Sequence, residues 1–163
     1  MKSVLRLVLI AVLMGVGAWM WTVLFPSPEK IIRRRLVELA RIVSTSPGEN
    51  DLARLADANN VASFFAASVE LKVTLPILSQ HSSLEREEIS GMVYAGRSQV
   101  GRLRVTFPDI NVKVAPDKQS AVADLTVEAT YPGDRQLQEM KIFLRRVDGQ
   151  WLITRAETVQ VLS

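Results

Sequence analysis

An uncharged apolar run, Leu7 to Phe25, stands at the amino-terminal end of the chain. Its 19 residues would extend about 28 Å as an α-helix, close to the thickness of a bilayer's hydrocarbon core. Trp19 and Trp21 lie near its carboxyl end, where indole rings favour the headgroup layer, and Pro26 closes it. A helix that is apolar on every side needs lipid or protein around it, and a chain terminus offers little protein to cover it. We therefore expect residues 1–25 to form a single-pass membrane anchor.

The same residues permit a second interpretation, a cleaved signal peptide. Lys2 and Arg6 would form its charged start, residues 7–15 its apolar stretch and residues 16–18 its small-residue cleavage site. The apolar run continues to Phe25, farther than a signal sequence requires. An uncleaved anchor is therefore the interpretation that we follow.

The charges on the two sides of the run give opposing indications of orientation. Lys2, Arg6 and the terminal amine precede the run, whereas five cations follow it within a short distance: Lys30, Arg33, Arg34, Arg35 and Arg41. A count of these charges would place the remainder of the chain in the cytoplasm. The arginines, however, belong to a predicted amphipathic helix, and a short charged tail ahead of a first apolar run commonly stays inside. We expect an extracytoplasmic domain, with the cytoplasmic orientation as the alternative.

Composition excludes several classes of protein. The absence of cysteine rules out a disulfide scaffold, a thiolate metal site and a cysteine nucleophile. The net charge is +3, and two of the cations, Lys2 and Arg6, lie in the predicted anchor, residues 1–25, which leaves +1 for the remainder. Because nucleic-acid binding requires a strong and clustered basic excess, we expect no nucleic-acid partner.

Three helices are predicted after the apolar run. The first follows the capping residues Ser27 and Pro28 and extends to about residue 44, with Ile32, Leu36, Leu39 and Val43 facing inward. The second begins at Asn50 or Asp51 and extends to about residue 67, with Leu52, Leu55, Ala56 and Phe64 or Phe65 inward. The third follows a capping box of Ser82 and Glu85, covers residues 84–100 and places Ile89, Met92, Val93 and Gly96 near its inner side.

Apolar and polar residues alternate with the period of a β-strand in the rest of the chain. The alternation occurs over residues 69–75, 103–107, 110–114, 125–131, 140–144 and 151–162. At Pro108 and Asp109 the apolar set slips by one residue, as a β-bulge would produce, and Asp148 and Gly149 are typical of a two-residue hairpin turn. The predicted class is α+β: a transmembrane helix followed by a cone-shaped roll of three helices on a bent antiparallel sheet.

This order of elements resembles the nuclear transport factor 2-like superfamily, which includes ketosteroid isomerase, scytalone dehydratase and many non-enzymatic domains. The resemblance covers residues 28–162 and rests on three features: the passage from helix to strand at residues 66–71, the bend at residues 107–110, and the closing hairpin at residues 143–153. It implies a domain over residues 26–163. One fold of this kind hosts many activities, so the resemblance indicates the fold rather than the function.

Enzymes of this superfamily place an Asp or His base, with Tyr or acid partners, inside the apolar cone. No ionisable residue interrupts the predicted inward register before Arg146, near a strand end. If Trp151 and Ile153 point inward, Arg155 and Glu157 share their side; the opposite register puts that pair in solvent. The candidate ligand pocket therefore consists of Tyr94, Tyr131, Trp151, Arg155 and Glu157.

No cofactor and no metal are expected. His81, the only histidine, falls in a predicted loop and cannot build the usual multi-histidine zinc set alone. Arg33, Arg34 and Arg35 form a membrane-proximal basic cluster, which is either a solvated helix face or a contact for anionic headgroups.

The expected function is a non-catalytic binding or assembly domain behind one membrane span, with a homodimer or a membrane protein complex as its partner. The alternative is a membrane-anchored isomerase, dehydratase or hydrolase that takes a small apolar ligand into the cone. Catalytic residues are not assigned, and whether the protein is an enzyme stays open.

Overall fold

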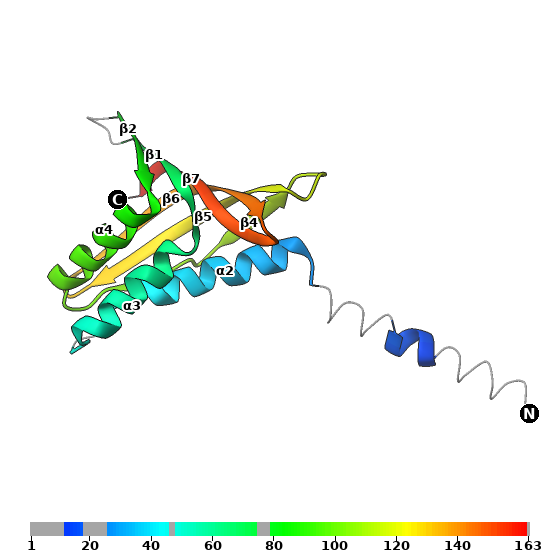
Figure 1. The fold of residues 1–163 in the computed structure, drawn as a ribbon, viewed down its shortest axis with the longest axis horizontal. Coiled ribbons are helices and arrows are strands. Elements are labelled where there is room, and N and C mark those ends of the chain that lie inside the picture. The colour runs from blue at the N-terminus through cyan, green and yellow to red at the C-terminus, as the bar shows by residue number, and fades with distance from the viewer. Residues whose placement is uncertain (1–11, 18–25, 46–47, 75–78, 163) are drawn as a thin grey trace, which may run out of the picture.

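The computed structural model describes residues 12–17, 26–45, 48–74 and 79–162 (Figure 1). Its elements are α2 (Pro28–Val43), α3 (Asp51–Ala62), β1 (Phe65–Thr74), β2 (Ser79–Glu85), α4 (Arg86–Gln99), β3 (Arg104–Thr106), β4 (Ile110–Val114), β5 (Ser120–Tyr131), β6 (Asp134–Val147) and β7 (Gln150–Leu162). The predicted α+β class with a bent sheet is confirmed.

Most of the predicted anchor lies outside the described residues. Within it the structure describes only residues 12–17, which are helical and expose Val12, Leu13, Met14 and Val16. None of the helices in the described part of the chain combines the length and the apolar character that a membrane crossing requires.

Helix α2 forms where the capping residues and the apolar spacing predicted it. Ser27 stands at the N-cap position, but its side chain makes no capping hydrogen bond. Pro28 occupies the first turn and Glu29 adds an acid there, where the helix dipole favours negative charge. Ile32, Leu36 and Leu39 are buried, as predicted. This stripe fastens α2 to the inner face of the sheet.

Helix α3 differs from the prediction in the residue at which it ends and in the residues that it buries. It is capped by Asn50, whose side chain accepts a hydrogen bond of 2.7 Å from the Ala53 amide, but it ends at Ala62 because β1 already begins at Phe65. Its buried residues are Ala58, Val61 and Ala62. The predicted inward residues Leu52 (77% exposed), Leu55 (48% exposed) and Ala56 lie on the surface, because the first turns of α3 extend past the core.

Residues 79–85 form strand β2, where a loop around His81 and the start of the third helix at residue 84 were predicted. His81 therefore lies in a strand, paired in register with Lys72. The sequence pattern did not predict this strand, because most of its residues are polar and have low strand propensity. The capping box of α4 consequently shifts from Ser82 and Glu85 to Glu85 and Glu88, and the helix begins at Arg86. Ile89 is buried as predicted, whereas Met92 is 59% exposed and Gly96 is also exposed.

The seven strands form one sheet in the order β2-β1-β7-β6-β5-β3, with β4 also pairing β5. The prediction of a purely antiparallel sheet is wrong in one place, since β1 pairs β7 in parallel. An alternating apolar pattern carries no information on strand direction, so the sequence could not show this.

Three one-residue β-bulges interrupt the register of the described strands. At the first, Thr106 of β3 pairs Glu128 of β5, and Ile110 of β4 pairs Leu125 of β5. The segment from β3 to β4 therefore has one residue more than the opposing part of β5, as the slip at residues 108–109 predicted. The second lies in β7, where Thr154 falls between two registered pairs formed by Ile153 and Arg155. The third lies farther along the same strand, where Val159 falls between the pairs formed by Thr158 and Gln160. The β6–β7 turn has the predicted Asp-Gly geometry, with φ of 49° at Asp148 and 80° at Gly149.

The core lies between the helices and the inner face of the sheet, which we define as the face that packs against α2 and α3. From the helices it contains Ile32, Leu36, Leu39, Val61 and Phe64, and from the strands Ile110, Ala121, Ala123, Leu125, Ile142, Leu144, Trp151, Ile153 and Ala156. Side chains that alternate with the core residues along β1 and β4 to β7 point to the other side of the sheet, which we call the outer face.

Candidate functional site

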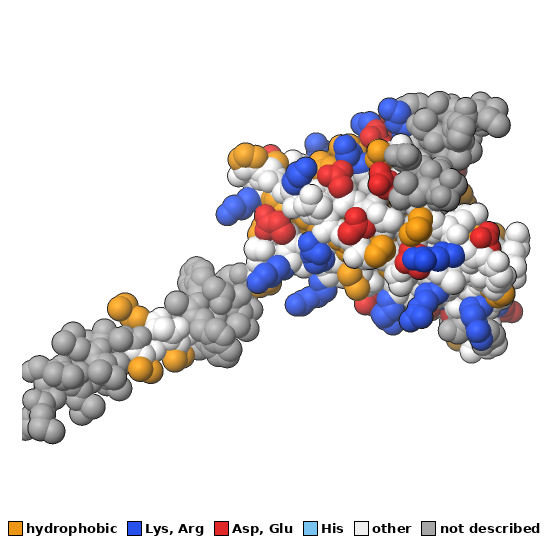
Figure 2. Space-filling view, turned by 180° about the vertical axis from the view of Figure 1, so that it is seen from behind, with side chains coloured by type: hydrophobic (Ala, Val, Ile, Leu, Met, Phe, Trp, Pro, Cys, Tyr) orange, Lys and Arg blue, Asp and Glu red, His pale blue; other side chains and the backbone are white. Residues whose placement is uncertain are grey.

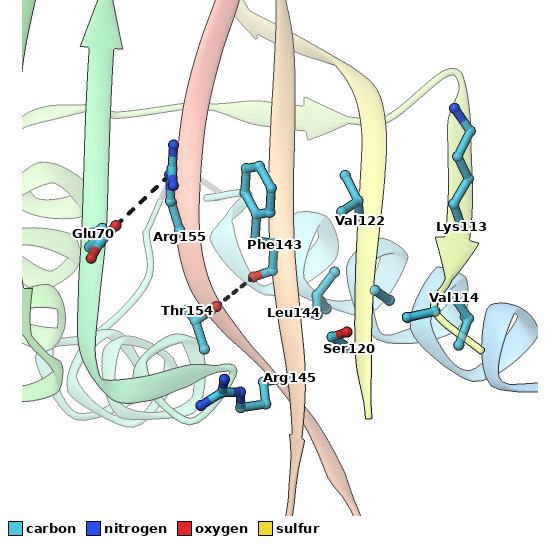
Figure 3. Close-up of a pocket in the computed structure, with 12 residues that line it drawn as sticks. Glu70, Lys113, Val114, Ser120, Val122, Phe143, Leu144, Arg145, Thr154 and Arg155 are labelled. Carbon is cyan, nitrogen blue, oxygen red and sulfur yellow. Dashed lines mark hydrogen bonds and ion pairs between the residues drawn. The ribbon is translucent and has the colours of Figure 1, made fainter. Parts of the chain in front are cut away.

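Five strands contribute one residue each to a continuous row on the outer face (Figure 3). Glu70 of β1, Arg155 of β7, Phe143 of β6, Val122 of β5 and Lys113 of β4 are paired neighbours in register. Directly opposed residues of neighbouring strands lie close enough to interact. We call these residues the outer row.

Arg155 is the centre of the contacts in this row. Its guanidinium forms an ion pair with Glu157 on the same strand and lies 3.9 Å from the Glu70 carboxylate. The guanidinium carbon is also 4.9 Å from the centroid of the Phe143 ring, a cation–π distance. The Arg155 side chain remains 38% exposed, so it is held in place and still meets solvent.

A hollow of about 610 Å³ lies over this part of the sheet. Its lining includes all five residues of the outer row, together with Val114, Ala115, Ser120, Ala121, Leu144, Arg145 and Thr154. Apolar and charged groups therefore border the same space, a combination common in binding sites.

A second row runs beside the first and alternates in charge. Lys72, Glu157, Lys141 and Asp124 are registered neighbours on β1, β7, β6 and β5. Asp124 lies 3.7 Å from Lys141 and 3.7 Å from Lys113. In the space-filling view of Figure 2, acidic and basic side chains are likewise interspersed, with apolar side chains between them. We call these four residues the charged row.

The bulge at Thr154 explains why both registers considered for β7 are partly correct. Before it, Trp151 and Ile153 belong to the core. After it, Ala156 takes the core position, and Arg155 and Glu157 take the outer one. The Arg–Glu pair therefore does not point into the cone with Trp151.

The structure brings together only two of the five predicted pocket residues, Arg155 and Glu157. Trp151 is 3% exposed and packed in the core. Tyr94 on α4 and Tyr131 at the end of β5 are half-buried and do not line the outer hollow.

The predicted basic cluster on α2 divides into two environments. Arg33 and Arg34 are exposed. Arg35 turns toward the body of the protein, with its guanidinium carbon 4.8 Å from the centroid of the Phe64 ring, and burial lowers the pKa of Arg35. Its Nε atom has no hydrogen-bond partner among the described residues.

Arg97 of α4 is the residue that the sequence analysis missed. Its side chain is only 4% exposed and bonds Glu49 at 2.6 Å and Asp57 at 2.8 Å. It also donates to the main-chain carbonyls of Ile42 and Ser44. Arg97 thus joins α4 to α3, to the end of α2 and to the segment before α3. Its position in a helix with several exposed neighbours gave no signal of burial.

The described residues contain no group of three or more His, Asp or Glu side chains placed to hold a metal ion. The buried polar or charged residues in this part of the chain are Thr45, Arg97 and Thr158. Thr158 accepts a hydrogen bond from the Gln138 amide at 2.9 Å, and Arg97 is occupied by its acids.

No model of a known protein family matches the chain, and no curated protein matches it in sequence. Solved structures do match. The yeast UBP3-associated protein BRE5 aligns with a TM-score of 0.62 and 16% identity, covering 85% of this chain and 99% of that one. An NTF2-like protein of unknown function from Pseudomonas aeruginosa aligns with a TM-score of 0.63 and 11% identity, over 82% and 99% of the two chains.

A putative scytalone dehydratase from Novosphingobium aromaticivorans aligns with a TM-score of 0.54 and 14% identity, over 82% of this chain and 85% of that one. At these identities the likeness establishes the fold alone. The fold is therefore NTF2-like, as the sequence resemblance implied, and it is shared by proteins described as enzymes and by proteins described as associated partners.

Proposed function

We propose that this protein is a single-pass membrane protein whose NTF2-like domain, residues 26–163, is a non-catalytic module for binding or assembly. One observation carries the proposal: the core between helices and sheet is a cluster of apolar side chains, while the hollow and the two rows of polar and charged residues lie on the outer face. An NTF2-like enzyme needs an acid or base within the cone. A surface with ordered charges instead suits recognition of another molecule.

A second copy of the chain fits the charged row. The row alternates in sign, so it is complementary to itself when one copy is turned over about a two-fold axis that crosses it. With the axis between Glu157 and Lys141, Glu157 of one copy faces Lys141 of the other. Exposed charges of this kind set register and orientation more than affinity, and the apolar Val122 and Phe143 would supply the buried contact.

The assembly is tested by light scattering on the full-length chain in a neutral detergent. We expect a protein mass of twice 18.1 kDa for the unchanged chain and a monomer for Lys141→Glu, which puts like charges together. Lys118→Glu makes the same charge change at an exposed turn and should leave the dimer intact. A monomeric unchanged chain, or equal behaviour of the two variants, would reject dimerisation through the outer face.

The anchor is part of the proposal, with residues 7–25 as the span and an extracytoplasmic domain. Its support is the length and apolar character of the run. Protease treatment of intact spheroplasts that carry a tag after Ser163 tests it. Loss of the tag, together with a full-length mass before digestion, is the expected result. A protected tag would place the domain in the cytoplasm, and a shortened mass would indicate a cleaved signal peptide.

The hollow favours a second candidate function, binding of a small apolar ligand, with isomerase, dehydratase or hydrolase activity as its catalytic form. Val122 and Phe143 would contact the apolar part of such a ligand and Arg155 a polar group. Arg155→Ala should then weaken binding of a hydrophobic fluorescent probe, whereas Arg146→Ala, an exposed arginine outside the lining, should not. Equal probe binding by both variants would remove this candidate.

A further inference from the structure

A second groove lies on another side of the domain, between α2 and the edge strand β3. It has a volume of about 740 Å³. Its lining consists of Val37, Ala40, Arg41, Ser44, Thr45, Arg102, Leu103, Arg104, Val105, Thr106 and Phe107. It shares no residue with the hollow on the outer face, so it is independent of the function proposed above. We call it the α2–β3 groove.

The groove combines apolar side chains with one sign of charge. Val37 is 52% exposed although it is aliphatic, and Leu103, Val105 and Phe107 are half-buried. Three arginines belong to the lining, and it contains no aspartate or glutamate. The groove is therefore amphipathic and cationic, which differs from the balanced outer face.

Two of these arginines have no acid partner within the described part of the chain. Arg102 and Arg104 are both exposed, and neither forms an ion pair there. Arg41 is the paired one, bonded to Glu38 at 2.5 Å. The strands of the outer face, by contrast, pair Lys113, Lys141, Arg135 and Arg155 with acids. Like charges that gather without counter-charges attract an anionic partner.

The backbone groups on the free side of β3 already form hydrogen bonds with Ser44 and Thr45. A partner therefore cannot bind there by adding a strand to the sheet. Thr45 exchanges main-chain hydrogen bonds with Leu103, its amide donating at 2.8 Å. The Val105 amide donates to the Ser44 hydroxyl at 2.9 Å. A ligand in the groove would therefore be recognised by its side chains: apolar groups against Val37 and Phe107, and acidic groups against the arginines.

We propose that the α2–β3 groove is a docking site for an acidic amphipathic segment of a partner protein. A groove bounded by a helix on one side and a strand on the other accommodates a chain. A bilayer surface is flat on this scale and would meet only the side chains that project farthest. The lining contains no acid, so a basic segment would meet only the positive charge of the arginines and would be repelled.

Fluorescence anisotropy on the full-length chain in a neutral detergent tests the proposal. The probe is a short labelled peptide of alternating glutamate and leucine, and a peptide of alternating lysine and leucine is its control. We expect the acidic peptide to bind, the basic peptide not to bind, and the affinity to fall with added salt.

Matched variants locate the site. Arg104→Glu should weaken binding of the acidic peptide about tenfold, because charge reversal replaces attraction with repulsion. Arg146→Glu makes the same change at an exposed strand arginine that also lacks an acid partner among the described residues, and it should have no effect. Val37→Asp, at a side chain that is 52% exposed, should also weaken binding.

Three outcomes would overturn the proposal: no binding of the acidic peptide, equal loss in Arg104→Glu and Arg146→Glu, or unchanged binding in Arg104→Glu and Val37→Asp. Vesicles that contain phosphatidylserine provide the remaining arm. If Arg104→Glu abolishes binding to vesicles while the peptide does not bind, the groove contacts a membrane and not a protein segment. The mass measurement on Lys141→Glu is unaffected by any of these results.

Discussion

Replacement of Arg97 by methionine is expected to destabilise the domain more than any other single charge removal in the described residues. The side chain of Arg97 is 4% exposed, so its charge is compensated by Glu49 and Asp57 and not by water. Methionine fills much of the same volume, which keeps the cavity contribution small. The loss therefore reports on the polar contacts.

The size of the stability loss follows from the two carboxylates, Glu49 and Asp57, that lose their partner. Removal of one partner from a buried ion pair costs about 3 to 5 kcal/mol, because the remaining charge stays desolvated. Glu49 and Asp57 keep 17% and 35% of their side-chain surface exposed, so water partly relieves them. We therefore expect the lower end, about 3 kcal/mol, which corresponds to a decrease of about 6 to 12 °C in Tm for a domain of this size.

Thermal unfolding of the full-length chain in a neutral detergent, followed by circular dichroism, measures the effect. Arg41→Met is the matched control, since it removes an arginine from an exposed, solvent-screened pair with Glu38 and should change Tm much less than Arg97→Met. Asp57→Asn should destabilise the unchanged chain but have little effect in Arg97→Met, a coupling of about 1 to 2 kcal/mol. Equal Tm values for Arg97→Met and Arg41→Met would refute the view that buried charge compensation holds α4 in place.

Three further predictions concern individual positions. Gly149→Ala should lower stability by about 1 to 2 kcal/mol in urea titration, because φ is +80° and no atom lies within 4 Å of an added Cβ, so the effect is conformational alone. Leu36→Ala should cost about 3 kcal/mol and Leu52→Ala less than about 0.5, since one side chain is 2% exposed and the other lies 77% exposed; equal losses would contradict the orientation of α3. The hydrogen bond from Arg41 lowers the pKa of Glu38, so the pair's contribution is present above the ordinary glutamate range and disappears as pH falls through the lowered pKa; a carbon-13 NMR titration that gives an ordinary value would contradict the pairing.

The parts of the fold that were predictable are those with local signals. The proline at the start of the helix and the spacing of Ile32 and Leu36 located α2, because its burial is set by one stripe against one sheet. The slip at residues 108–109 and the Asp-Gly turn also depend only on neighbouring residues. Each of these features can be recognised without knowledge of the rest of the chain.

The features that were missed depend on long-range contacts. Strand β2 exists because β1 offers it a pairing edge, and its polar residues give no strand signal of their own. Leu52 and Leu55 have helical spacing suited to a core, but α3 begins beyond the end of that core. Arg97 is buried because two acids from distant segments converge on it. In each case the deciding partner lies far away along the sequence.

The bulge at Thr154 could not be predicted from the sequence, and it decides which face of the sheet carries Arg155 and Glu157. One unpaired residue in β7 reverses the parity of residues 155–158, up to a second register shift at Val159. A regular strand would have placed Arg155 and Glu157 among core residues. With the bulge, Ala156 occupies the core position, and the Arg–Glu pair joins the outer row and the charged row. A single backbone irregularity thus separates an NTF2-like domain with charged groups in its cone from one with an apolar core and an ordered charged surface. This chain has the second arrangement, and for that reason the outer face and the α2–β3 groove are the surfaces on which experiments should begin.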